Sequence, residues 1–229
     1  MSERQRASGG SVGWDEHSQV NGTRGKRRII VAITGASGAI YGARMLQLLH
    51  GIPDVETHAI VTTGARKTLA YETDIDPVAL TELADVVHRE NDLAASISSG
   101  SFRTDGMVVA PCSIKTLSGI ANCYDDNLVV RAADVVLKER RRLVLLVRET
   151  PLHLSHLRLM TEVTSAGGIV VPPVPAFYSH PVTVDDIVDQ TVVRVLDLFG
   201  LDLGGITRWT GGRDAARRVR ASRDDPPPS

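Results

Sequence analysis

The chain has 229 residues, 42% of them hydrophobic, and a formal net charge of -1 at pH 7. This length is enough to bury a full core as one domain, and the near-neutral charge argues against a nucleic acid or an anionic membrane as the main partner. No apolar run approaches the roughly 20 residues that cross a bilayer, and the first residues lack the apolar segment of a secretory signal. We therefore expect a cytoplasmic protein.

The ends of the chain differ in composition from its middle. Residues 1–25 and 211–229 are rich in Ser, Gly and charged residues and show no apolar periodicity. Such segments are typical of disordered tails, which leaves residues 26–210 as a single predicted domain. The two cysteines, Cys112 and Cys123, match neither a redox pair nor a zinc site in their spacing.

The central sequence feature is the stretch 28–44, where an apolar run breaks into a turn of small residues and a helical pattern follows. This pattern predicts a buried strand at 29–33, a turn at 34–38 and a helix. We expect the turn to leave the helix N-terminus bare, so that its amides, with the hydroxyls of Thr34 and Ser37, face a phosphate. The glycine spacing is neither a dinucleotide fingerprint nor a P-loop, and a turn without a ligand is the alternative.

The rest of the chain alternates between short apolar runs and amphipathic segments. Strands are predicted at 56–61, 106–110, 143–147 and 168–171, and 88–101 is expected to be a loop. Helices are predicted at 65–71 and at 127–141, the latter after Asp125-Asp126. Another helix starts at Asp76-Pro77, and a final one runs from Asp185-Asp186 to about 200. Two more helices follow the strands 106–110 and 143–147 and end at 121 and 166. The alternation predicts a doubly wound parallel α/β sheet of Rossmann-like (flavodoxin-like) type, with ligands at the carboxyl ends of the strands.

Polar residues follow the predicted strand ends and are expected to converge on one rim. They lie at 34–37, 62–63, 113–116, 148–149 and 178. The fixed positive charge could come from several cations that would suit phosphate groups, namely Lys115, Arg131, Lys138, Arg148 and Arg194. The alternative for each cation is a solvated helix surface.

Glu149 follows a strand directly and is a candidate acid or base, with a structural ion pair to Arg148 as the alternative. Glu72 is a weaker candidate of the same kind. The pair His153 and His156 falls short of a recognised metal site, so packed or surface histidines are favoured.

Several stretches together resemble one family, the flavin prenyltransferases of the UbiX/Pad type. The stretches are ITGASGAIYGARML, ETD at 72–74, SISSGSF, PCSIKTLSGIA, DNLVVRAADVVLKERRRLVLLVRETPLHLSHLRLM, PPVPAFYSHP and RW at 208–209. The resemblance implies a subunit that binds FMN and assembles into a large homo-oligomer, typically a dodecamer. It implies transfer of a dimethylallyl group from dimethylallyl phosphate to N5 and C6 of reduced FMN without a metal ion. The prenylated FMN would serve a partner decarboxylase of the UbiD type.

The resemblance also implies roles for particular residues. FMN would be bound by Gly35, Ala36, Ser37, Thr62, Ser113, Ile114, Lys115, Thr116 and Arg131. The dimethylallyl phosphate would be held by Tyr178 and Arg194, helped by Lys138 and Arg148, with Trp209 as a wall of the prenyl pocket. Glu149 would be the acid or base, assisted by Glu72 and Ser37.

Three alternatives stay open on the sequence. A flavoprotein decarboxylase that oxidises a thiol substrate would carry an Asn-bearing turn where this chain has Pro111 to Thr116. A flavin carrier without catalysis would make no use of Glu149 and its neighbours. Direct decarboxylation by the chain itself is the third alternative.

Overall fold

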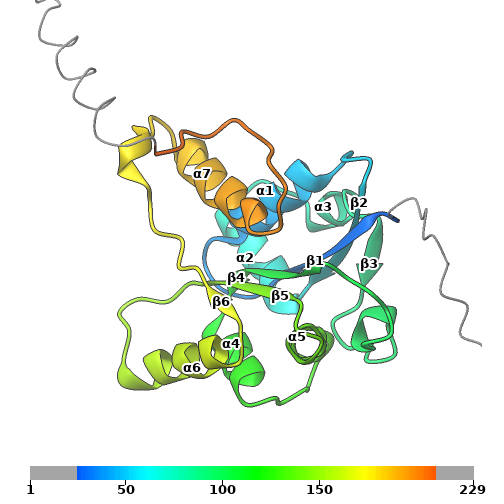
Figure 1. The fold of residues 1–229 in the computed structure, drawn as a ribbon. Coiled ribbons are helices and arrows are strands. Elements are labelled where there is room, and N and C mark those ends of the chain that lie inside the picture. The colour runs from blue at the N-terminus through cyan, green and yellow to red at the C-terminus, as the bar shows by residue number, and fades with distance from the viewer. Residues whose placement is uncertain (1–24, 210–229) are drawn as a thin grey trace, which may run out of the picture.

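A computed structural model describes residues 25–209, and its centre is a six-stranded, wholly parallel sheet (Figure 1). The strands are β1 (Arg27–Ile33), β2 (Val55–Val61), β3 (Val86–His88), β4 (Gly106–Cys112), β5 (Arg142–Val147) and β6 (Ile169–Val170). Their order is β3-β2-β1-β4-β5-β6. The direction of winding reverses between β1 and β4, and ligands of such sheets bind outside the strand ends at this point.

Helices cover both faces of the sheet, as Figure 1 shows. They are α1 (Ala39–Leu49), α2 (Thr63–Glu72), α3 (Pro77–Thr81), α4 (Ile114–Ala121), α5 (Leu128–Lys138), α6 (Leu154–Ser165) and α7 (Val184–Asp197), with short 3-10 turns at Ser96–Ser98 and Phe177–Ser179. Side chains of β1 alternate between two cores. Ile29, Val31 and Ile33 pack with α1, α2, α3 and α7, whereas Ile30 and Ala32 pack with α4, α5 and α6.

The predicted doubly wound α/β sheet is confirmed, with differences in its elements. β3 was not predicted, because a strand of three residues at a sheet edge has no apolar run, and the expected loop 88–101 begins only where β3 ends and contains a 3-10 turn. Two helix starts also differ: Asn127 rather than Asp125-Asp126 caps α5, and Thr183 rather than Asp185-Asp186 caps α7. The start at Asp76-Pro77 is confirmed.

The turn between β1 and α1 depends on close backbone packing. Gly38 caps α1 in the left-handed region, with φ at 94°, where a side chain would be strained. Gly35 packs against the first turn of α2, so that a Cβ added to Gly35 would lie 3.0 Å from the Cα of Gly64. These contacts set the position of the turn relative to the neighbouring helix.

Apart from Gly25, the predicted tails lie outside the described residues, and the domain boundaries at 26 and 210 stay predictions. Within residues 25–209, no helix combines the length and apolar character needed to cross a membrane.

Candidate active site

Two cavities open at the carboxyl ends of the strands, on either side of the β1–α1 turn. The first, cavity A, has a volume of about 880 Å³ and lies between the turn, α2 and the starts of α4 and α5. Its lining comprises Thr34, Gly35, Thr62, Thr63, Gly64, Glu90, Ser113, Lys115, Thr116, Ser118, Gly119, Asn122, Tyr124, Asp126, Asn127 and Val130. Hydroxyls and amides dominate this wall, which suits a polar ligand.

The second, cavity B, has a volume of about 650 Å³ and lies between the start of α1, the end of β5, the segment after β6 and the start of α7. Its lining comprises Ser37, Gly38, Ile40, Tyr41, Glu72, Thr73, Val147, Arg148, Glu149, Thr150, Pro172, Pro173, Val174, Val184, Ile187 and Val188. Apolar side chains face a small group of charged ones here. The β1–α1 turn is the wall that the two cavities share.

The prediction of a bare N-terminus on α1 is wrong. Oε2 of Glu72 accepts hydrogen bonds from the backbone amides of Gly38, at 2.8 Å, and Ala39, at 3.2 Å. A carboxylate of the chain itself therefore occupies the place where a phosphate was expected, because Glu72 at the end of α2 reaches back to the turn.

Two side chains of cavity B have pKa values that depart from the ordinary. Burial raises the pKa of Glu72, but hydrogen bonds from Ser37, Gly38 and Ala39 and the nearby positive charge of Arg148 outweigh it, so the pKa is lowered. Burial raises the pKa of Tyr41, and Arg148 partly offsets the rise. Cavity B thus favours an ionised Glu72 beside a neutral phenol.

Two further helices begin at cavity A. The hydroxyl of Thr62 caps α2 by accepting from the amide of Ala65 at 3.1 Å, and the hydroxyl of Ser113 caps α4 by accepting from the amide of Thr116 at 3.3 Å. The hydroxyl of Thr34 accepts from the amide of Ser113 at 2.9 Å, which ties the β1–α1 turn to the start of α4. Both helices therefore begin at the wall of cavity A, where the positive end of each helix dipole favours a negative charge.

The structure places most of the predicted flavin-binding residues around cavity A. The residues on its wall are Gly35, Thr62, Ser113, Lys115 and Thr116. Ala36 instead closes the turn, with its amide 2.9 Å from the carbonyl of Thr34, and Ile114 packs on the second core. Ser37 faces cavity B.

Arg131 lies on neither wall. Its guanidinium binds Asp125 at 3.1 Å and Asp134 at 3.0 Å, and donates to the carbonyl of Ser98 at 3.2 Å. Three acceptors of its own chain therefore fix this side chain beside α5.

The three predicted catalytic residues, Glu149, Glu72 and Ser37, all line cavity B, together with Arg148. Glu149 is exposed, and its Oε1 accepts from the amide of Thr150 at 2.9 Å. Among the described residues Glu149 forms no ion pair within 4.0 Å. The alternative of a structural ion pair between Glu149 and Arg148 is therefore not seen in this structure.

Lys138 lies at the opposite edge of the sheet. It ends α5, just before β5 begins, whereas Arg148 follows the end of β5. The six residues of β5 span roughly 20 Å, which is more than two side chains can bridge to one phosphate. Lys138 instead pairs with Glu139 at 2.8 Å.

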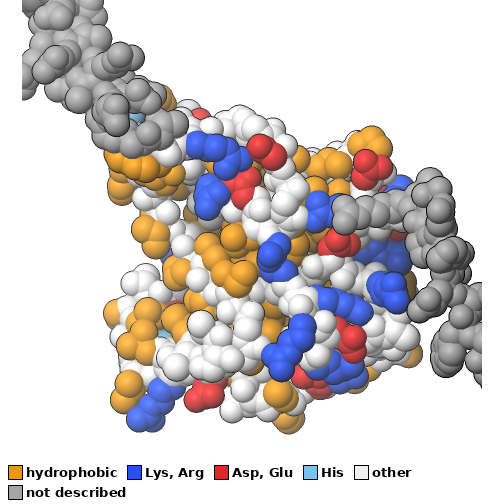
Figure 2. Space-filling view, viewed as in Figure 1, with side chains coloured by type: hydrophobic (Ala, Val, Ile, Leu, Met, Phe, Trp, Pro, Cys, Tyr) orange, Lys and Arg blue, Asp and Glu red, His pale blue; other side chains and the backbone are white. Residues whose placement is uncertain are grey.

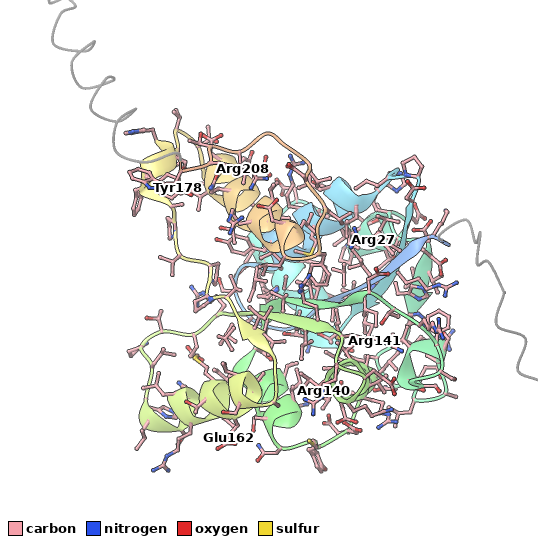
Figure 3. The ribbon with its side chains drawn as sticks, in the orientation of Figure 1. Arg27, Arg140, Arg141, Glu162, Tyr178 and Arg208 are labelled. Carbon is pink, nitrogen blue, oxygen red and sulfur yellow. The ribbon has the colours of Figure 1, made fainter. Side chains whose placement is uncertain are left out.

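Figure 3 shows Arg27, Arg140 and Arg141, which lie at or just before the starts of β1 and β5, on the other side of the molecule from Tyr178. Figure 2 shows several Lys and Arg side chains on the same side as Arg27. Of the predicted cations, Lys115 lines cavity A, Arg148 lines cavity B and the other three line neither, so these charges do not converge within one chain.

The other predicted donor-binding residues form a cluster outside both cavities. The rings of Tyr178 and Trp209 meet edge to face with centroids 5.7 Å apart, and Gln190 donates to the hydroxyl of Tyr178 at 3.3 Å. Arg194, one turn after Gln190 on α7, pairs with Asp197. Trp209 is 62% exposed.

Sequence reasoning missed some residues that line the cavities. Tyr41 and the pair Pro172-Pro173 line cavity B, and Glu90 lines cavity A. Tyr41 lies in the first turn of α1, four residues after Ser37 in the β1–α1 turn, and both residues line cavity B. Glu90 lies in the predicted loop 88–101, but no pattern in that loop distinguished it from its polar neighbours.

Of the two histidines, His153 is exposed and His156 is partly buried. His153 caps α6 through a bond from the amide of Ser155 to its Nδ1 at 3.2 Å, and its ring stacks on that of His156. Among residues 25–209, no three His, Cys, Asp or Glu side chains are grouped to hold a metal ion.

Comparison with known proteins identifies the family. The model of the family described as Flavoprotein matches residues 17–196. Flavin prenyltransferase UbiX of Escherichia coli strain K12 is 59% identical over 187 residues, which cover 81% of this chain and 99% of that protein.

Solved structures agree with this likeness. AnUbiX (PadA1) in complex with FMN and dimethylallyl pyrophosphate has a TM-score of 0.79 and 54% identity, covering 81% of this chain and 98% of that one. A dodecameric FMN-dependent UbiX-like decarboxylase from Escherichia coli O157:H7 has a TM-score of 0.79 and 53% identity, covering 80% and 100%.

The likeness to a cysteine decarboxylase is much weaker. The FMN-dependent cysteine decarboxylase TvaF has 18% identity and a TM-score of 0.52, covering 65% of this chain and 91% of that one. This likeness shows a shared fold alone. The identity and the coverage together place this chain in the UbiX family of flavin prenyltransferases.

Proposed function

We propose that the chain transfers a dimethylallyl group from dimethylallyl phosphate to N5 and C6 of reduced FMN and releases prenylated FMN. The observation that carries the proposal is the joint position of Glu149, Glu72, Ser37 and Arg148 in cavity B. That cavity shares the β1–α1 turn with the polar cavity A. The sequence identity to prenyltransferases supports the same assignment.

Cavity A fits the phosphate and polyol chain of a flavin. Its volume lies within the range of small-molecule sites, and its wall offers hydroxyls of Thr62, Ser113 and Thr116 and the helix amides beside them. The close approach of Gly35 and Gly64 keeps the wall free of side chains at that point. Reduced FMN, when bound, would supply the nucleophilic atoms of the reaction.

Cavity B fits the prenyl donor. Apolar side chains of Val147, Val174 and Ile187 provide surface for a dimethylallyl group, while Arg148 offers a guanidinium for the phosphate. Departure of phosphate from an allylic carbon leaves positive charge on carbon and negative charge on oxygen. Fixed cations can stabilise the phosphate, and the ionised Glu72 can stabilise the positive carbon.

Glu149 would move the proton. It lies beside Arg148 at the end of β5, so a carboxylic acid there can protonate the departing phosphate and a carboxylate can accept the proton released during ring closure. Ser37 and Glu72 both line cavity B, and Ser37 is among the groups that lower the pKa of Glu72. We assign them the positioning of the reacting groups against the turn.

A second copy of the chain would complete the donor site. Lys138 and Arg148 are separated by the length of β5, so both can hold one phosphate only if Lys138 comes from a neighbouring subunit. The large exposed apolar side chains, including Tyr71, Tyr124, Val174, Phe177, Val182 and Val184, fit burial between subunits. We propose a homo-oligomer, and a dodecamer by analogy with the dodecameric relative.

The product is a modified flavin that the chain itself does not consume. We propose that a decarboxylase of the UbiD type takes it up as cofactor. The donor is proposed as the monophosphate, although the related structure AnUbiX (PadA1) holds dimethylallyl pyrophosphate.

The test is an anaerobic incubation of the purified chain with reduced FMN and dimethylallyl phosphate in the presence of a chelator, followed by mass spectrometry of the released flavin. We expect FMN heavier by one isoprene unit, and loss of this product in Glu149→Gln. Glu162→Gln, an exposed carboxylate on α6, is the matched control and should keep activity. Unmodified FMN from a chain that binds flavin would contradict the proposal.

A further inference from the structure

Glu90 is a carboxylate on the wall of cavity A that no step of the proposed reaction uses. Its Oε2 accepts from the backbone amide of Thr63 at 2.9 Å, and its Oε1 accepts from the hydroxyl of Thr63. Thr63 is the first residue of α2. A negative charge of the chain thus occupies an amide at a helix start inside the cavity proposed for the flavin phosphate.

The same residue connects two walls of the cavity. The side chain of Glu90 binds the start of α2. Its backbone carbonyl accepts a hydrogen bond at 2.7 Å from the amide of Leu128, which is the first residue of α5. Thr63 on one side and Asn127 on the other both line cavity A. Glu90 therefore bridges α2 and α5 across the cavity edge.

The charges around cavity A are unfavourable for an anion. Lys115 is the one cation on its wall, and Glu90 and Asp126 are the two acids. The side chain of Lys115 is 84% exposed, and its Nζ lies 3.9 Å from Oδ2 of Asp126. The cavity is therefore net negative, although the flavin phosphate that it is proposed to hold carries between about one and two negative charges.

We propose that Glu90 competes with the flavin phosphate for the start of α2 and so sets how tightly this chain distinguishes phosphorylated from unphosphorylated flavin. The inference rests on the proposed placement of FMN in cavity A. In the ligand-free chain Glu90 holds α2 through Thr63. When FMN binds, its phosphate accepts from the amide of Thr63 in place of the Glu90 carboxylate, which turns away. The repulsion between this carboxylate and the phosphate weakens FMN binding, whereas riboflavin has no phosphate and is not affected.

The experiment measures the dissociation constants of FMN and of riboflavin by quenching of flavin fluorescence, for the full chain without prenyl donor. The variant is Glu90→Gln, which keeps an acceptor for the amide of Thr63 and removes the charge. Glu82→Gln, an exposed carboxylate after α3 and outside cavity A, is the matched control. Thermal unfolding checks that each variant is folded.

We expect FMN to bind Glu90→Gln about five-fold more tightly at low ionic strength, with riboflavin changed by less than about two-fold. The gain should shrink as KCl is raised, because salt screens the repulsion that the substitution removes. Glu82→Gln should match the unsubstituted chain with both ligands.

Two outcomes would overturn the inference. If Glu90→Gln leaves FMN binding unchanged, the phosphate does not meet this carboxylate. If FMN and riboflavin binding weaken together, Glu90 only braces the two helices. Neither result depends on prenyl transfer, so failure of the proposed reaction would be seen separately as tight FMN binding without a heavier product.

Discussion

Glu72 and Gly38 are 34 residues apart in sequence, and the carboxylate of the first accepts a hydrogen bond from the amide of the second at 2.8 Å. The end of α2 therefore holds the start of α1. This bond, with its companion to Ala39, fixes the shared wall of the two cavities before any ligand binds. It also gives Glu72 a structural role beside the catalytic role proposed for it.

Replacing Glu72 by Gln should make stability less dependent on pH. The pKa of Glu72 is lowered in the folded chain, so its charge stabilises the fold above the ordinary carboxyl pKa, and this contribution is lost as pH falls through the lowered value. We expect Glu72→Gln to lower the free energy of unfolding by about 0.5 kcal/mol at pH 7. Because the side chain is exposed, the effect stays at the low end.

Urea unfolding at pH 7 and near pH 3 would measure this difference. The difference between the two proteins should shrink at the acid pH, because protonation of Glu72 becomes more complete as the pH falls toward the lowered pKa of that carboxylate. A deficit of the same size at both pH values would show that the geometry of the cap matters and its charge does not. Glu82→Gln serves again as the control.

Gly35→Ala should weaken flavin binding and stability together. The added Cβ would lie 3.0 Å from the Cα of Gly64 and 3.1 Å from its carbonyl carbon, so the turn and α2 must move apart. Overpacking of this kind costs about 1–3 kcal/mol. Gly25→Ala, whose Cβ would meet nothing within 4 Å, should change neither property. Calorimetric unfolding and flavin titration on both variants would check this, and an unaffected Gly35→Ala would contradict it.

The two cysteines should differ sharply in reactivity. Cys112 is buried, and burial raises the pKa of its thiol well above the usual range, whereas Cys123 is exposed. Because the thiolate is the reactive form, a thiol reagent such as Ellman's should modify one cysteine in the native chain and two after denaturation. Cys123→Ser should abolish the native reaction. Rapid modification of both native thiols would show that the strand end at Cys112 opens readily.

Mixed oligomers of two inactive variants, one changed at Lys138 and the other at Glu149, should recover part of the prenyl-transfer activity. Lys138→Met and Glu149→Gln should each abolish most prenyl transfer. If each site takes Glu149 from one chain and Lys138 from another, oligomers formed from an equal mixture should hold both in about a quarter of their sites. Prenylated FMN per subunit, measured after co-expression, would report this recovery. No recovery would place both residues in one chain or exclude one from the site.

The sequence predicted the sheet well because its strands are short, apolar and separated by clear turn residues. The order of the elements and the cap at Asp76 followed from local chemistry. β3 did not, because an edge strand that includes His88 is defined by pairing with β2 and not by its own residues. Glu90, in the predicted loop after β3, was missed because no pattern distinguished it from its polar neighbours.

The sequence predicted those site residues whose positions depend only on their place after the end of a strand. Glu149 and Ser37 lie a few residues past the ends of their strands, and both line cavity B. The long-range contact of Glu72 with α1 was not readable, since it depends on how α2 packs beside the turn. The separation of Lys138 from Arg148 follows from the direction of α5 and β5, which the charge pattern did not take into account.

The shared wall between the cavities implies that occupancy of one changes affinity in the other. Thr34 and Gly35 face cavity A while Ser37 and Gly38 face cavity B, within a single five-residue turn. A ligand that stiffens this turn from one side lowers the entropy cost for a ligand on the other, and the coupling is reciprocal. Flavin and prenyl donor should therefore show cooperative binding, with each slowing the escape of the other.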